Sequence, residues 1–237
     1  MSTVVQPEVG FAAFFLNTAW PVSGLHAPTV MAEAARAHLR DQGLTTSVTS
    51  AVGLLSAVDA ALRPLLVATG REGDLEANWD FGGHAGLIMQ GEGAVVVARV
   101  GEVRAHLVVE GECRLLLDDH TLLNRLRNDP RHAGSDLRSV PSVVTEFLGN
   151  GVLPADAACR IDVPKDSTLI VASSQLLDLI DASTLCESVD RAATDVGEFL
   201  ADAVRRASGT SPRTGCILVA RFSEFCGRFS SLPSRCR

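Results

Sequence analysis

The sequence lacks cysteines at C-x-x-C spacing, an excess of basic residues and an uninterrupted hydrophobic run long enough to cross a membrane. Its six cysteines include no C-x-x-C pair, and most lie in apolar stretches, which is typical of free thiols in a reducing compartment. The 28 acidic residues outnumber the 21 basic ones, so the bulk charge argues against a nucleic-acid-binding surface. These absences predict an intracellular protein that binds no nucleic acid, with the cytoplasm favoured and the organelle undetermined.

No segment is predicted to insert into a membrane. The longest apolar run, within residues 52–68, is interrupted by Asp59 and Arg63 and is short and polar for a bilayer span. The first ten residues carry no lysine or arginine, unlike a secretory signal or a transit peptide. The length of 237 residues and the hydrophobic fraction of 46% instead suit one globular domain with a sizeable core.

We expect a single domain over residues 1–222, followed by a mildly basic, solvated C-terminal tail at 223–237. In chain order, hydrophobic periodicity predicts a strand at 11–16, helices at 29–40 and 47–67, strands at 84–89, 93–100, 105–109 and 112–117, a short helix at 121–128, strands at 158–163 and 167–173, helical segments within 183–208, and a strand at 216–222. Strands joined by short turns form antiparallel meanders. This order predicts an α+β fold, a four-layer α-β-β-α sandwich of two antiparallel sheets flanked by helices.

Several segments resemble, in the right order, motifs of the PP2C-type (PPM, metal-dependent) protein phosphatases. Ala94–Leu107 is similar to the family hairpin that contains G-D-S-R, and Leu117–Asn124 is similar to L-T-x-D-H-[ST]-x-x-N. Gly82–Gly86 stands where the family has G-S-T-A, Asp166–Asp178 resembles the segment with S-D-G, and Thr214–Phe222 resembles the closing D-N-I-T strand. The resemblance covers nearly the whole chain and implies the same α-β-β-α sandwich.

The carboxylates that bind metal in this family are replaced at every recognisable position. Two Mn²⁺ or Mg²⁺ ions need anionic oxygen ligands there to activate the water that attacks phosphorus. By resemblance, Asn17 and Thr18 replace the Asp-Gly of D-G-[HM]-G-G, Ser174 replaces the Asp of S-D-G, and Arg213 replaces the Asp of D-N-I-T. An arginine would repel a cation by roughly 4 kcal/mol at about 4 Å and an effective dielectric near 20. We therefore predict no metal, no cofactor and no catalytic residue.

The start of the chain also departs from the family, whose first strand pair carries a phosphate-binding arginine. Only ten residues precede Phe11, and none is arginine. We expect this edge of the sheet to be missing, so that residues 11–16 form an exposed edge open to strand addition. That edge, or the tail from Ser223, is predicted to contact a partner. In the hairpin motif, Glu102 replaces the family Asp, and Arg104 is retained with a structural role.

Other chemistry has little support in the sequence. The histidines form no H-E-x-x-H motif, no G-x-S-x-G surrounds Ser173, and no G-K-[ST] follows the glycines at 91 and 93. His120 is predicted to be a turn residue. The acidic pairs Asp118 with Asp119, and Asp178 with Asp181, are predicted to be solvated loop carboxylates.

The favoured hypothesis is a pseudophosphatase, a catalytically inactive PP2C-like protein that acts as a scaffold, regulatory or structural subunit of a larger protein complex. Two alternatives stay open. An active Mn/Mg-dependent Ser/Thr phosphatase would need rearranged ligands such as Asp80, Glu102, Asp178 or Asp181. A non-hydrolysing sensor would bind a phosphorylated ligand in the old cleft, with Arg213 as the phosphate-binding residue.

Overall fold

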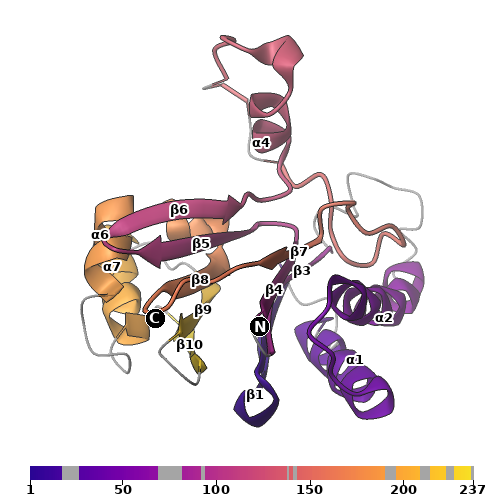
Figure 1. Cartoon of the computed structure of the whole chain (residues 1–237). Coiled ribbons are helices and arrows are strands. Elements are labelled where there is room, and N and C mark those ends of the chain that lie inside the picture. Colours follow the sequence, from indigo (N-terminus) through magenta and orange to yellow (C-terminus); the bar gives the residue numbers. More distant parts are fainter. Residues whose placement is uncertain are drawn as a thin grey trace.

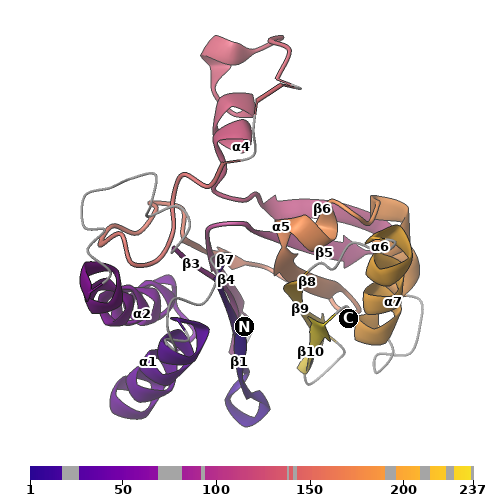
Figure 2. The ribbon, with the colours of Figure 1, turned by 180° about the vertical axis from the view of Figure 1, so that it is seen from behind.

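The computed structural model describes residues 1–17, 27–68, 82–91, 94–137, 139–140, 143–189, 196–208, 214–222 and 227–235. Two five-stranded antiparallel sheets pack face to face, and helices cover the outer face of each sheet (Figure 1). Figure 2 shows the same arrangement from behind, with α1 and α2 on one side of the sheets and α5, α6 and α7 on the other. The predicted α-β-β-α sandwich is therefore confirmed.

The first sheet has the strand order β1-β2-β3-β4-β7, and α1 and α2 cover its outer face. Its strands are β1 (Ser2–Gln6), β2 (Phe11–Asn17), β3 (Gly83–Gly91), β4 (Ala94–Val100) and β7 (Ala158–Ile161), and its helices are α1 (Ala27–Gln42) and α2 (Val48–Ala68). Successive side chains of a strand point to opposite faces. In β2, Ala13 and Phe15 therefore pack against the helices, whereas Ala12 and Phe14 pack against the second sheet.

The second sheet has the order β10-β9-β8-β5-β6 and is covered by α5, α6 and α7. Its strands are β5 (Val103–Val109), β6 (Glu112–Leu117), β8 (Thr168–Ser173), β9 (Thr214–Phe222) and β10 (Gly227–Arg235), and its helices are α5 (Ser174–Leu177), α6 (Ala182–Val189) and α7 (Val196–Ser208). Every residue of β8 is buried because this strand lies inside the sheet and is covered on both faces. That burial explains its nearly continuous apolar sequence.

Both ends of the chain differ from the sequence prediction. β1, followed by the 3-10 helix η1 (Pro7–Val9), pairs with β2 from Ser2↔Phe15 to Gln6↔Phe11. β2 is therefore an interior strand, and the predicted exposed edge at residues 11–16 is wrong, since these residues are at most 9% exposed. Within the predicted tail at 223–237, the described residues form β10, an outer strand that pairs along the whole of β9.

The long helix α2 packs on the first sheet, although its sequence is apolar enough for a helix that crosses a membrane. Its residues Val48–Leu65 have the length and composition of a candidate membrane span, of which 33% is buried. The inner face of α2 packs into the core. Its core residues are each no more than 3% exposed: Ala51, Leu54, Leu55, Val58 and Leu62. The helix is thus a core helix of the sandwich with an outer face that stays exposed.

An arm made of α4 (Leu122–Arg127) and the 3-10 helix η2 (Pro130–His132) projects away from the sandwich (Figure 1). Two backbone hydrogen bonds hold its base: the Leu122 N–H donates to the Val143 carbonyl at 2.7 Å, and the Thr145 N–H donates to the His120 carbonyl at 2.8 Å. The segment that precedes the arm, residues 118–120, is thereby fixed at the edge of the sandwich where β6 ends.

Candidate functional site

One edge of the sandwich collects the strand ends that carry the predicted ligand positions. β2 ends with Asn17, which pairs with Gly83, and β8 is followed by Ser174, whose N–H donates to the Glu102 carbonyl at 3.0 Å. Between the sheets, the turn from β4 to β5 runs through residues 101–102 at this edge. Thr18 and Arg213 lie outside the described residues, although Arg213 directly precedes β9, which begins here too. The assignments of these positions, including phosphate binding by Arg213, stay predictions.

Ser174 places a hydroxyl where the resemblance requires a carboxylate. It is 4% exposed and begins α5. The next residue, Gln175, donates from Nε2 to Oε2 of Glu102 at 2.9 Å. Burial raises the pKa of Glu102, and the opposing hydrogen bond from Gln175 does not reverse that direction. This part of the edge therefore presents a hydroxyl, an amide and a carboxylate that already has a donor.

The carboxylates nearest to Ser174 are bound by Arg104 of β5. Its Nη2 lies 2.7 Å from Oδ2 of Asp119, its Nη1 lies 2.5 Å from Oδ1 of Asp178, and its Nε lies 3.4 Å from Oδ1 of Asp118. Arg104 is 17% exposed and the Asp119 side chain is fully buried. Burial acts to lower the pKa of Arg104, but the three carboxylates outweigh burial and raise it. We call Arg104 with Asp118, Asp119 and Asp178 the Arg104 network.

The motif Asp-His-Thr-x-x-Asn at residues 119–124 donates hydrogen bonds to carboxylates of this network and leads into the arm. Thr121 is the N-cap of α4, and its hydroxyl donates to Oδ1 of Asp119 at 2.7 Å. Asn124 donates from Nδ2 to Asp119 and, at 2.7 Å, to Asp118. Burial alone would raise the pKa of Asp119, but Ser174, Thr121, Arg104 and Asn124 together hold it below the ordinary value. The prediction of a solvated carboxylate is wrong for Asp119: Thr121 and Asn124 of its own motif donate to it, and the fold adds Arg104.

Two buried histidines accept hydrogen bonds from the turn between β4 and β5. The Glu102 N–H donates to Nδ1 of His84 at 2.8 Å, and the Gly101 N–H donates to Nδ1 of His120 at 3.2 Å. Gly101 has a φ of +83°, and a Cβ there would collide with the His84 ring. Burial lowers the pKa of His84 to about 4. For His84, an Nδ1 that accepts implies a neutral ring with its proton on Nε2, so this histidine acts as a structural acceptor.

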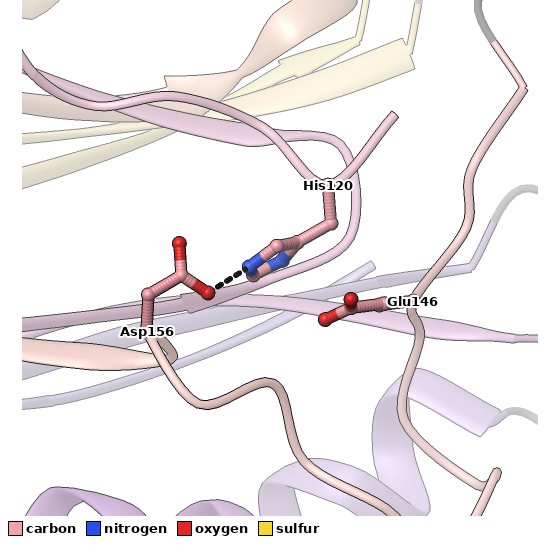
Figure 3. Close-up of side chains that lie close together, drawn as sticks. All are labelled: His120, Glu146 and Asp156. Carbon is pink, nitrogen blue, oxygen red and sulfur yellow. Dashed lines mark hydrogen bonds and ion pairs between the residues drawn. The ribbon is translucent and has the colours of Figure 1, made fainter. Parts of the chain in front are cut away.

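One group in the described part of the chain brings together three potential metal ligands: His120, Glu146 and Asp156, whose ligand atoms all lie within 4.8 Å of one another. Figure 3 shows His120 joined to Asp156, at 3.1 Å from Nε2 to Oδ1, with Glu146 apart from both. The ligand atom of His120 would have to be Nε2, because its Nδ1 accepts from the Gly101 N–H. Arg99 also lies against that nitrogen, with Nη1 at 2.6 Å, and pairs with Asp156 at 2.8 Å. Arg99 thus already engages both His120 and Asp156, whose side chain is 65% exposed, so the group fits a partly exposed ion-pair network and does not fit a metal site.

The residues at the edge do not fit the two-metal centre of the PP2C family either. Of the four rearranged ligands considered above, Asp80 lies outside the described residues and Glu102 is bound to Gln175. Asp178 is bound to Arg104, and Asp181 accepts from the Thr184 N–H at 2.7 Å at the start of α6. The described members of this set are each engaged elsewhere and form no shared oxygen cage.

The architecture is that of the PP2C-type, or PPM, Ser/Thr phosphatases, as the motifs predicted. The structure of "PppA, a key regulatory component of T6SS in Pseudomonas aeruginosa" matches with a TM-score of 0.70 at 16% identity, over 93% of this chain and 90% of PppA. The serine/threonine phosphatase PstP/Ppp of Mycobacterium tuberculosis matches with a TM-score of 0.62 at 19% identity, over 90% of this chain and 88% of that one.

A third match is the PPM Ser-Thr phosphatase MsPP of Mycobacterium smegmatis, with a TM-score of 0.65 at 16% identity, over 90% of this chain and 87% of MsPP. No family model and no curated protein sequence matches the chain. At these identities the structural likeness establishes the fold, and activity has to be argued from the residues of the site.

Proposed function

We propose that this protein is a catalytically inactive PP2C-like protein that acts by binding protein partners, as a regulatory, scaffold or structural subunit of a larger complex in an intracellular, reducing compartment. The observation that carries the proposal is the charge arrangement at the edge. Ser174 replaces a carboxylate, and the neighbouring carboxylates already neutralise Arg104. PppA, which has this fold, is described as a key regulatory component, and this description supports the regulatory part of the proposal.

The physical argument concerns the charge needed to hold two divalent cations. Hard cations need several anionic oxygens that are free to coordinate them. In the Arg104 network, Asp119 would have to give up both Arg104 and its hydrogen-bond donors before it could bind a metal. Breaking such a buried pair costs about 3–5 kcal/mol. The free energy of metal binding would have to exceed this cost for a metal to occupy the site.

Aryl-phosphate hydrolysis tests the proposal directly. We expect the purified protein to show no increase in p-nitrophenyl phosphate hydrolysis when Mn²⁺ is added, whereas an active PP2C phosphatase assayed in parallel does. The variants Asp178→Ala and Asp181→Ala form a matched pair, because only Asp178 lies in the Arg104 network. A Mn²⁺-stimulated rate that disappears in Asp178→Ala but persists in Asp181→Ala would establish the active-phosphatase alternative instead.

A further inference from the structure

A groove lies on the helical side of the first sheet and shares no described lining residue with the Arg104 network. It has a volume of about 810 Å³ and is formed between the outer face of α2 and the loop around residues 149–153. Most of its described lining residues are apolar, whereas Ser56 is polar and Asp59 and Arg63 are charged. The described lining consists of Val52, Ser56, Asp59, Ala60, Arg63, Pro64, Gly151 and Leu153. This volume falls in the range of about 300–1,000 Å³ that is common for small-molecule sites.

The loop wall of the groove is held in place by Asp59. This side chain is 6% exposed, and its Oδ1 accepts from the Gly149 N–H at 2.6 Å and from the Gly151 N–H at 3.3 Å. Gly151 has a φ of +80°, and a Cβ there would lie 3.1 Å from Cζ of Arg63. The negative charge of Asp59 is thus directed at the loop backbone, and the guanidinium of Arg63 lies beside the same loop.

Arg63 is exposed and has no hydrogen-bond or ion-pair partner among the residues that the structure describes. Among the described residues, the groove therefore combines an apolar wall with one cation that no carboxylate neutralises. Its surroundings are apolar as well. Val152, in the loop, is 69% exposed, and Val48, one helical turn before Val52, is 38% exposed. These two valines add apolar surface beside the lining of the groove.

We infer that this groove binds a small apolar ligand that carries a carboxylate. The alkyl part of the ligand would lie along Val52, Ala60 and Leu153, and the carboxylate would accept hydrogen bonds from the Arg63 guanidinium, whose planar fork suits two carboxylate oxygens. The inference goes beyond the proposed function, because it concerns residues outside the Arg104 network and a different class of partner.

Calorimetric titration with octanoate, octanol and octylammonium, below their aggregation concentrations, tests the inference. We expect octanoate to bind at least about tenfold more tightly than octanol, and octylammonium to bind most weakly. Arg63→Gln should remove the preference for octanoate, while Arg63→Lys keeps part of it. Ala60→Trp, which fills the groove, should weaken octanoate and octanol alike by about tenfold or more.

Two controls keep these outcomes interpretable. Arg40→Gln removes an exposed arginine from α1, outside the groove, and should leave octanoate binding unchanged. Arg63 and Ala60 are themselves exposed, so circular dichroism should show that the variants fold. Methyl NMR shifts of Val52 and Leu153 locate the bound ligand.

Three results would overturn the inference. Equal affinity for octanoate and octanol in the unmodified protein would remove the role of Arg63. Octanoate-induced shifts confined to methyl groups elsewhere would remove the groove as the site. Binding to phospholipid vesicles, or self-association abolished by Ala60→Trp, without any octanoate titration would assign this face to a membrane or to a second copy of the chain.

Discussion

Replacing Arg104 with leucine is expected to lower the free energy of unfolding by about 3–5 kcal/mol at neutral pH, because it leaves a buried carboxylate without its cation. The Asp119 side chain is fully buried and lies 2.7 Å from the guanidinium, whereas Asp178 is 60% exposed and can turn to solvent. The loss therefore falls mainly on Asp119. Without Arg104 the pKa of Asp119 should rise, so the cost of the substitution should shrink at acidic pH, where a protonated Asp119 no longer needs a cation.

Urea unfolding at several pH values measures this effect. Arg114→Leu, on the neighbouring strand β6, is the matched control, because Arg114 pairs with Glu112 at 2.7 Å while the two side chains are 64% and 67% exposed. An exposed pair of this kind contributes about 0–1 kcal/mol. If Arg104→Leu costs no more than Arg114→Leu, or if its cost is the same at acidic and neutral pH, the Arg104 network does not have the structural role assigned to it.

Acidification from pH 6.5 to about pH 4 is expected to remove about 3 kcal/mol of stability through His84 alone. Its pKa is lowered by burial from 6.5 to about 4, so between these values the unfolded chain binds a proton that the folded chain does not. The contribution is complete above the unfolded pKa and is lost as the pH falls toward the folded one. His106, whose pKa is lowered to about 4 by burial and by the charge of Arg104, should add a loss in the same window.

The variant His84→Asn separates this effect from general acid unfolding. An asparagine can still accept from the Glu102 N–H but does not titrate, so the slope of unfolding free energy against pH should fall by about one proton between pH 4 and 6.5. His38→Asn, on α1, controls for the loss of a histidine as such. A slope in His84→Asn equal to that of the unmodified protein would contradict the assignment.

The sandwich could be predicted from the sequence because its central strands carry long apolar segments in a motif order that spans the chain. β1 was missed because Ser2–Gln6 is short and its stability comes from pairing with β2, a contact that local periodicity does not encode. β10 was missed for a related reason: the sequence Gly227–Arg235 is polar and contains Pro233, and its order comes from the β9 ladder.

The ligand positions Asn17 and Ser174 could be proposed from motifs, and the backbone places both at one edge. The Arg104 network could not be predicted in the same way. Its guanidinium contacts Asp178, which is 74 residues away in sequence, and Asp119, which precedes the arm. Neither the burial of Asp119 nor the acceptor role of the two histidines leaves a periodic signal, because each depends on which strand ends meet in space.

The pairing of the outer strands determines where a label attached to them would lie. Ser2 pairs with Phe15, two residues before Asn17, and Arg235 pairs with Thr214, immediately after Arg213. Ser2 and Arg235 therefore both lie toward the edge that carries Asn17 and Ser174, so a fluorophore attached at either position would lie beside that edge. Such a label could obstruct a partner that docks there, whereas one attached to the projecting arm near Pro130 would report on binding from a distance.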